Sequence, residues 1–173
     1  IYVLGMSNGG MMAQALACKY SDLFKGVVNI VGMQHKDLSC IPDKPVNFII
    51  YGGMKDSVVP PITIQSSDGY FYEPMSNTFN AWADQFKCKT FKKSNIDIHN
   101  KIEKNIASSC KNNVQIVSLL NKEAGHYWPG INKSAGYCYS LPQTDINYHK
   151  CNFSIKNEWG NDFLIKILFN FVH

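Results

Sequence analysis

Arginine is absent from this sequence, and all 17 of its basic residues are lysines. The chain therefore has no planar guanidinium group that could hold a carboxylate or a phosphate through two parallel hydrogen bonds. This absence weighs against anionic substrates and favours neutral ones. The formal net charge is nevertheless +4 at pH 7, so the position of the lysines needs its own explanation.

One cluster of lysines could be interpreted as a nucleic-acid surface, because aromatic residues lie between the charges. The cluster consists of Phe86, Lys87, Lys89, Phe91, Lys92 and Lys93. A solvated, lysine-rich loop is the commoner meaning of such a run. We therefore expect a polar loop at this position and no nucleic-acid partner.

Long apolar runs are missing as well. No stretch reaches the roughly 18 apolar residues that are needed to cross a bilayer. The best candidate, residues 163–172, is short and contains Lys166 and Asn170. It is typical of a packed terminal helix, and we expect no membrane partner.

The usual motifs for metals and cofactors do not occur either. No pair of histidines or cysteines has the close spacing of a zinc site. Gly5, Gly9 and Gly10 surround a serine and lack the spacing of a phosphate loop or a dinucleotide fingerprint. We therefore expect no metal and no cofactor.

The composition fits a single globular domain, because 45% of the 173 residues are hydrophobic and can form a core. Apolar segments at residues 1–4, 27–32, 46–51 and 114–120 predict strands, and residues 11–19 and 76–86 predict helices. Strands that alternate with helices favour a parallel sheet covered by helices on both faces. The predicted fold class is α/β.

The most informative motif is Gly5-Met6-Ser7-Asn8-Gly9, which follows one apolar strand and precedes an apolar helix. A strand, this G-x-S-x-G turn and a helix are typical of the nucleophile elbow of the α/β-hydrolases, where glycines permit a cramped bend that exposes the serine oxygen. Ser7 is therefore the candidate nucleophile. The backbone N–H of Asn8, the next residue, is the candidate oxyanion donor.

Two further side chains complete a possible catalytic triad. Asp56 follows the strand at residues 46–51, and His126 follows the strand at residues 114–120. Exit loops of parallel strands converge at one edge of the sheet, and the order Ser, Asp, His is that of the α/β-hydrolase triad. We expect His126 to act as the general base and Asp56 to orient it. Their rivals in the sequence are Asp68, Asp84, Asp97, His35, His99, His149 and His173.

Trp128 lies two residues after His126. Such a tryptophan could form a wall of the substrate cleft. It is at least as often a core residue, because its large ring is mostly buried in folded proteins. Both interpretations stay open here.

Six cysteines are plentiful for this length, and an even number fits an oxidising compartment. Cys88 and Cys110 bracket one polar loop, and Cys138 and Cys151 bracket another. We expect these two pairs to form disulfides. Buried or incidental free thiols are the alternative for all six.

Three loops together resemble those of the extracellular polyhydroxybutyrate depolymerase and feruloyl esterase group. They read Gly-Met-Ser-Asn-Gly-Gly-Met-Met at 5–12, Gly-Gly-Met-Lys-Asp-Ser-Val-Val-Pro at 52–60, and Gly-His-Tyr-Trp-Pro-Gly at 125–130. The cysteine-bracketed segment from Cys138 to Cys151 is similar to a loop of the secreted depolymerases. The resemblance implies a secreted or periplasmic serine esterase with Ser7, Asp56 and His126 as its triad.

The sequence departs from this group at two points. Tyr51 stands where the group often has a histidine, which we expect to change local packing more than chemistry. The group also has an upstream histidine-glycine loop that gives a second oxyanion donor, and this sequence starts at Ile1. We therefore expect one partial α/β-hydrolase domain over residues 1–173 that lacks the N-terminal strands.

The expected partner is an ester substrate, which could be polymeric. Fold and triad do not choose between a polymer of short hydroxyacids, a feruloylated or acetylated polysaccharide, and a peptide bond. A non-catalytic fragment or binding domain that retains the turn is the alternative from another functional class. The oligomeric state stays open.

Overall fold

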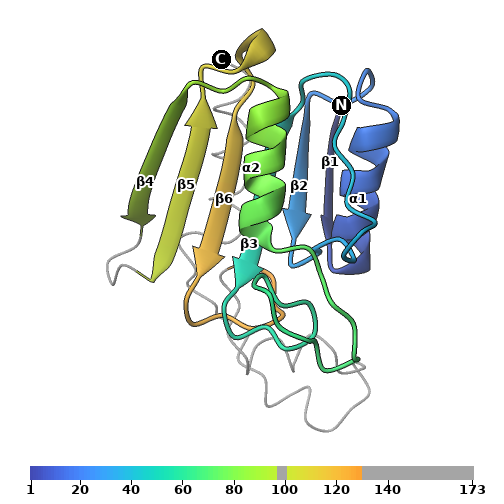
Figure 1. The fold of residues 1–173 in the computed structure, drawn as a ribbon, viewed down its shortest axis with the longest axis vertical. Helices are drawn as coiled ribbons and strands as arrows, with labels where there is room; N and C mark the ends of the chain where they lie inside the picture. Colours follow the sequence, from blue (N-terminus) through green and yellow to red (C-terminus); the bar gives the residue numbers. More distant parts are fainter. Residues whose placement is uncertain (97–100, 130–173) are drawn as a thin grey trace, which may run out of the picture. The chain divides into compact units, whose positions relative to one another are not determined.

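The computed structural model describes residues 1–96 and 101–129 (Figure 1). The chain divides into two compact units, Ile1–His126 and Tyr127–His173. The described elements all belong to the first unit, and they follow one another as β1 (Tyr2–Met6), α1 (Asn8–Lys19), β2 (Gly26–Ile30), β3 (Asn47–Gly53), α2 (Met75–Gln85), β4 (Thr90–Ile96), β5 (Ile102–Ser108), a 3-10 helix (Lys111–Asn113) and β6 (Ile116–Asn121).

The strands form one mixed six-stranded sheet in the order β1-β2-β3-β6-β5-β4. Four neighbours, β1, β2, β3 and β6, run parallel. β5 runs antiparallel to β6, and β4 runs antiparallel to β5 (Figure 1). Because β1, β3 and β6 point the same way, the loops that follow them leave from one edge of the sheet.

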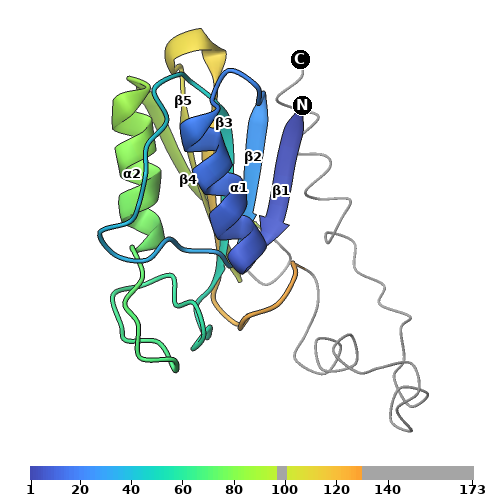
Figure 2. The same cartoon turned by 90° about the vertical axis from the view of Figure 1, so that its right-hand side faces the viewer.

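The predicted fold class, a mostly parallel sheet flanked by helices as in an α/β-hydrolase, is wrong. Strands outnumber helices among the described elements, and the part of the sheet made by β4 and β5 is antiparallel. The helices α1 and α2 lie on the same face of the sheet (Figure 2). Val27 and Phe48 are register neighbours on that face and share one core cluster with Ala13 of α1 and Trp82 of α2.

The difference lies in the segment between Cys88 and Cys110, for which the sequence predicts a polar loop. The segment contains β4 and β5, paired from Thr90 with Ser108 to Ile96 with Ile102. Ile102 and Ala107 are fully buried, whereas the lysines of β4 are exposed to solvent. Buried apolar residues on the inner strand and lysines on the outermost strand are the normal composition of an edge hairpin, since charges at the edge prevent pairing with other chains.

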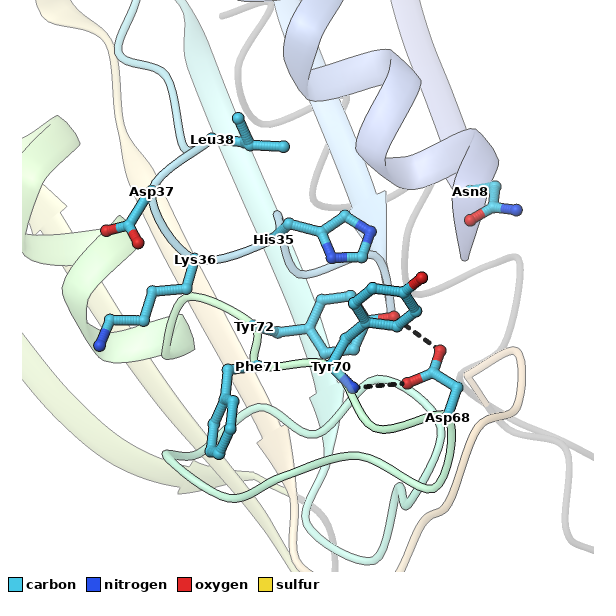
Figure 3. A pocket seen from close by; sticks show the side chains of 9 residues that line it. All are labelled: Asn8, His35, Lys36, Asp37, Leu38, Asp68, Tyr70, Phe71 and Tyr72. Carbon is cyan, nitrogen blue, oxygen red and sulfur yellow. Dashed lines mark hydrogen bonds between the residues drawn. The ribbon is translucent and has the colours of Figure 1, made fainter.

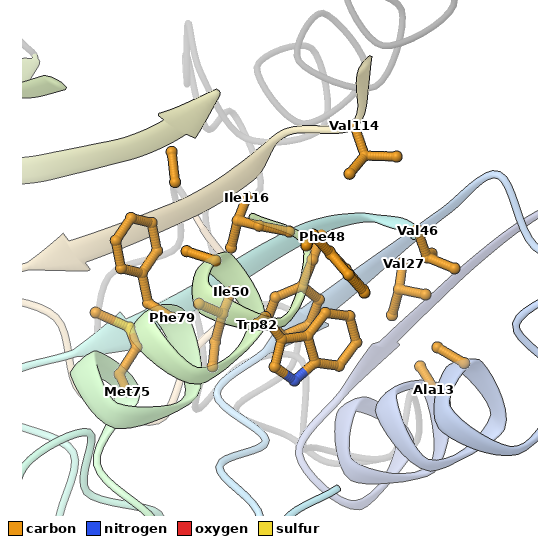
Figure 4. Close-up of a cluster of buried hydrophobic side chains, with 14 of the residues drawn as sticks. Ala13, Val27, Val46, Phe48, Ile50, Met75, Phe79, Trp82, Val114 and Ile116 are labelled. Carbon is orange, nitrogen blue, oxygen red and sulfur yellow. The ribbon is translucent and has the colours of Figure 1, made fainter. Parts of the chain in front are cut away.

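The core between the helices and the sheet is aromatic at its centre. The rings of Phe48 and Trp82 stack with their centroids 4.0 Å apart. The rings of Phe86 and Trp82 pack edge to face, with their centroids 6.0 Å apart. All three side chains are fully buried. Figure 4 shows Trp82 of α2 lying over the strand residues Phe48 and Ile50. This packing fixes α2 against β3 and β6.

Two disulfides join described residues. Cys88 pairs with Cys110 and connects the two ends of the β4–β5 hairpin, as the sequence predicts. Cys18 of α1 pairs with Cys40, a bond that the sequence does not predict. The predicted pair of Cys138 and Cys151 lies outside the described residues. In the part of the chain that the structure describes, no helix has the length and apolar character of a membrane span.

Candidate active site

Ser7, Asp56 and His126 lie together at the carboxyl edge of the parallel strands. Ser7 directly follows β1, Asp56 lies in the loop after β3, and His126 lies in the loop after β6. The Nε2 atom of His126 is 2.9 Å from the Oγ of Ser7, and its Nδ1 atom is 2.8 Å from an oxygen of Asp56. The structure therefore brings together the three side chains that the sequence singles out.

Ser7 has a backbone conformation that L-residues rarely adopt, with φ 54° and ψ −125°. The turn is held from both sides: the Ser7 N–H donates to the Ile30 carbonyl at 2.8 Å, and the Met11 N–H donates to the Ser7 carbonyl at 3.0 Å. Such a conformation costs about 1–3 kcal/mol and persists only where the surroundings impose it. A strained serine between a strand and a helix is the geometry of a nucleophile elbow.

Two glycines make this turn possible. A Cβ atom on Gly5 would collide with the carbonyl group of Gly9, and a Cβ on Gly10 would collide with the side chain of Asn29. Asn29 is fully buried and donates at 2.8 Å to the carbonyl of Gly32, so it has no room to withdraw. Gly9, in contrast, has open space around its missing side chain.

Asp56 is held by its own loop. One carboxylate oxygen accepts hydrogen bonds from the N–H groups of Val58 at 2.9 Å and Val59 at 2.8 Å. The other oxygen faces Nδ1 of His126. The side chain of Asp56 is completely buried, whereas the side chain of His126 is 20% exposed. The imidazole therefore has a buried carboxylate partner on one side and access to the surface on the other.

The loop that carries His126 is attached to the loop that carries Asp56. The N–H of Lys55 donates to the carbonyl of Ala124 at 2.9 Å, and the N–H of Met54 donates to the carbonyl of Asn121 at 2.8 Å. The side-chain oxygen of Asn121 accepts from the N–H of Ala124 at 3.2 Å. A Cβ on Gly53 would meet the carbonyl of Ala124, so the close approach of the two loops needs glycine at that position.

The arrangement can move a proton from Ser7 to His126. In the neutral imidazole one nitrogen donates and the other accepts. A carboxylate is acceptor-only, so Asp56 favours the tautomer in which Nδ1 carries the hydrogen. Nε2 is then free to accept the hydrogen of the Ser7 hydroxyl at 2.9 Å. This geometry is that of an activated serine nucleophile with an oriented base.

The other predicted site residues have different positions. Asn8 is the first residue of α1, and helix N-termini carry backbone N–H groups without a helical partner. Trp128 is half-buried and belongs to the second unit, so its role at the site stays a prediction. Of the rivals to the triad, Asp97, His99, His149 and His173 lie outside the described residues, and Asp84 is an exposed residue of α2.

The remaining rivals, Asp68 and His35, belong to a second cluster. The His35 ring lies 4.7 Å from the ring of Tyr72 and 5.1 Å from the ring of Tyr70. The Tyr72 hydroxyl donates to Asp68 at 3.1 Å. Burial, assisted by the neighbouring Asp68 carboxylate, raises the pKa of Tyr72 to about 12.

This cluster borders a cavity of about 630 Å³ that no sequence motif indicates (Figure 3). The cavity is formed by two segments that are far apart in the chain, 35–38 and 68–72, together with Asn8. The second segment lies in a stretch with the composition of turns. The antiparallel bridge between His35 and Tyr72 brings the two segments together, and no local pattern in the sequence signals that pairing.

Of the two rings in the lysine cluster, only Phe91 is exposed, at 57%. Phe86 is fully buried in the core, so its ring cannot stack on a base. Lys93 pairs with Glu103 of β5 at 2.9 Å. Within residues 1–96 and 101–129, no three histidine, cysteine, aspartate or glutamate side chains lie close enough together to hold a metal ion.

A scan against protein-family models gives no match for this chain, and a search of the curated proteins gives none either. Function must therefore be inferred from the geometry of the site itself.

Proposed function

We propose that this chain is a serine ester hydrolase in which Ser7, His126 and Asp56 form the catalytic triad. The observation that carries the proposal is the unbroken chain of contacts from Asp56 through His126 to Ser7, at 2.8 and 2.9 Å. The positive φ of Ser7 supports it independently, because strained backbone collects at reactive residues. The proposal concerns the site and does not depend on the α/β-hydrolase fold, which this chain does not adopt.

The reaction is acyl transfer to water. His126 takes the proton of Ser7 as the serine oxygen attacks the ester carbonyl, and Asp56 stabilises the imidazolium that forms. The N–H of Asn8 donates a hydrogen bond to the carbonyl oxygen and stabilises the negative charge that develops there. The alcohol leaves with the proton held by His126. Water, activated by the same imidazole, then releases the acid and regenerates Ser7.

Neutral esters are the substrate class that we favour, because the chain has no arginine to bind an anionic group bidentately. The resemblance of the three loops favours a polyhydroxybutyrate depolymerase-like activity, with a carbohydrate esterase of the feruloyl or acetylxylan type as the alternative. Clearing of a polyhydroxybutyrate film, compared with release of the acid from methyl ferulate, separates the two.

The two disulfides support a secreted or periplasmic location, because such bonds persist in oxidising compartments. A peptide map of the protein isolated without reductant tests this point. Free thiols at Cys18, Cys40, Cys88 and Cys110 would contradict it.

Labelling with a fluorophosphonate probe tests the catalytic proposal. The probe reacts with a serine only when a base activates it, so we expect stoichiometric labelling of the wild-type chain and none of Ser7→Ala. Ser57→Ala is the matched control, since Ser57 is an exposed serine in the same loop as Asp56. Hydrolysis of p-nitrophenyl butyrate should follow the same pattern. An unlabelled wild-type chain would favour the non-catalytic alternative, and labelling that survives Ser7→Ala would assign the nucleophile elsewhere.

A further inference from the structure

The cavity between residues 35–38 and 68–72 is adjacent to the reactive serine. Asn8, which lines it, directly follows Ser7 and carries the N–H that we assign to the oxyanion. The carbonyl group of an ester that is bound at the N–H of Asn8 would therefore lie next to the cavity. A volume of about 630 Å³ is within the usual range for small-molecule sites.

Four of the nine residues that line the cavity carry aromatic rings. His35, Tyr70 and Tyr72 form one packed set, in which Tyr72 is 5% exposed and Tyr70 is 57% exposed. The ring of Phe71 is 49% exposed. Figure 3 shows the ring of Tyr70 in front of that of Tyr72, with His35 beside both. Exposed rings backed by buried ones offer a flat apolar surface to another ring, and stacking would remove that surface from water.

The wall is held in position by backbone hydrogen bonds. The N–H of Lys36 donates to the carbonyl of Phe71 at 3.0 Å, and the N–H of Glu73 donates to the carbonyl of Gln34 at 2.7 Å. Asp68 accepts from the hydroxyls of Ser66 and Tyr72. A wall that is already ordered loses little conformational entropy when a ligand binds, which favours affinity.

The charges on the cavity wall disfavour an anionic ligand. Asp68 and Asp37 contribute two carboxylates, and Lys36 contributes one ammonium group. The hydrogen bond from the Ser66 hydroxyl holds the pKa of Asp68 below its usual range, so this carboxylate is ionised at neutral pH. An anionic group in the cavity would face a net negative wall.

We propose that this cavity is the specificity subsite of the esterase, that it binds a neutral aromatic ring of the ester, and that Tyr70 is the residue that selects for the ring. This inference rests on the proposed function, since it assigns the ring to an ester that Ser7 attacks, and within that function it favours a ring-bearing ester over polyhydroxybutyrate, whose units carry no ring. It identifies Tyr70, His35 and Tyr72 as specificity determinants that do not take part in the proton transfers.

The test compares kcat/KM for matched pairs of esters with and without a ring. Methyl 3-phenylpropionate against methyl butyrate varies the acyl group, and benzyl acetate against butyl acetate varies the alcohol. We expect a preference for the ring in at least one pair, and we expect Tyr70→Ala to lower that preference about 10-fold, the loss of one stacking contact and its buried area. Tyr70→Phe keeps the ring and should keep the preference.

Phe91→Ala is the matched control, because Phe91 is also 57% exposed but lies on β4 and does not line the cavity. It should leave the preference unchanged. The inference is overturned if wild type shows no ring preference in either pair, or if Tyr70→Ala lowers kcat/KM equally for ring-bearing and ring-free esters.

Binding to Ser7→Ala separates this inference from the proposed function. Benzyl alcohol and 1-butanol are titrated into that variant while the aromatic side-chain NMR signals of Tyr70 and His35 are followed. Selective shifts with benzyl alcohol support the subsite even if no ester is hydrolysed, in which case only the catalytic proposal fails. Absence of these shifts in a chain that hydrolyses esters through Ser7 overturns the subsite and leaves the catalytic proposal intact.

Discussion

Asp56 divides its carboxylate between the backbone of its own loop and the imidazole of His126. One oxygen accepts from Val58 and Val59, and the other lies 2.8 Å from Nδ1 of His126. The same side chain therefore has a structural task and a proposed catalytic task, carried by different atoms. A substitution that preserves one oxygen can separate the two.

Asp56→Asn should keep the fold and lose most of the activity. Its amide oxygen can still accept from Val58 and Val59, but an NH2 group facing Nδ1 favours the wrong tautomer of His126. We expect kcat to fall by about 10,000-fold with little change in the free energy of unfolding. Asp56→Ala should also lower that free energy by about 1–3 kcal/mol, because the buried Val59 N–H loses its acceptor. Ester hydrolysis and urea denaturation of both variants check this; equal stability losses would contradict the division of tasks.

Gly5→Ala and Gly9→Ala should have opposite effects. Gly5 has no room for a Cβ beside the Gly9 carbonyl, so alanine there should distort the turn at Ser7 and reduce fluorophosphonate labelling at least 10-fold. Gly9 has open space and lies in the first turn of α1, where alanine should stabilise by up to about 1 kcal/mol. The fluorophosphonate labelling rates and the melting temperatures of the two variants test this prediction. Similar behaviour of the two variants would contradict this contrast between a crowded and an open position.

The two disulfides close loops of the same length, with a sequence separation of 22 in each case. Loop entropy therefore predicts that removing either disulfide lowers the free energy of unfolding by the same amount, about 3 kcal/mol. The first double variant replaces Cys18 and Cys40 by alanine, and the second replaces Cys88 and Cys110. Only the first pair anchors the segment that carries His35, so only its removal should weaken the ring preference. Urea denaturation without reductant and the paired ester assay measure the two effects. If removal of the bond between Cys88 and Cys110 also abolished the ring preference, the role assigned to the bond between Cys18 and Cys40 would be wrong.

Tyr51 should make the protein sensitive to alkali. Burial raises its pKa from 10.0 to about 12, because the neutral phenol is favoured inside the protein. The folded chain thus keeps a proton that the unfolded chain releases, and stability that is complete below pH 10 should fall by about 2–3 kcal/mol as the pH rises to 12. Thermal melts of wild type and Tyr51→Phe between pH 8 and pH 12 test this. The variant should show a shallower decline, and parallel curves would rule the assignment out.

The sequence is most informative where function requires a local motif. Ser7 can be identified because a strand, a glycine-flanked serine and a helix are consecutive, and Asp56 and His126 because each follows an apolar strand. The convergence of their loops needs only that β1, β3 and β6 be parallel, which they are. The site prediction therefore does not depend on the parts of the fold for which the prediction is wrong.

The hairpin and the bond between Cys18 and Cys40 escape prediction for physical reasons. In β4, Lys92 and Lys93 are consecutive and therefore lie on opposite faces, so the strand lacks the alternation that would reveal it. Cys18 lies in a helix and Cys40 in a loop, and spacing alone cannot select one pairing among the many that six cysteines allow. The cavity wall depends on the long-range bridge between His35 and Tyr72.

β1 holds its place in the sheet by hydrogen bonds along one side, since it pairs only with β2 among the described strands. The proposed nucleophile thus follows a strand that is paired on one side only among the described strands, whereas its base and carboxylate follow strands that are paired on both sides. On warming, amide protons of β1 should exchange before those of β3 and β6, and the serine should drift from the imidazole while most of the sheet is still folded.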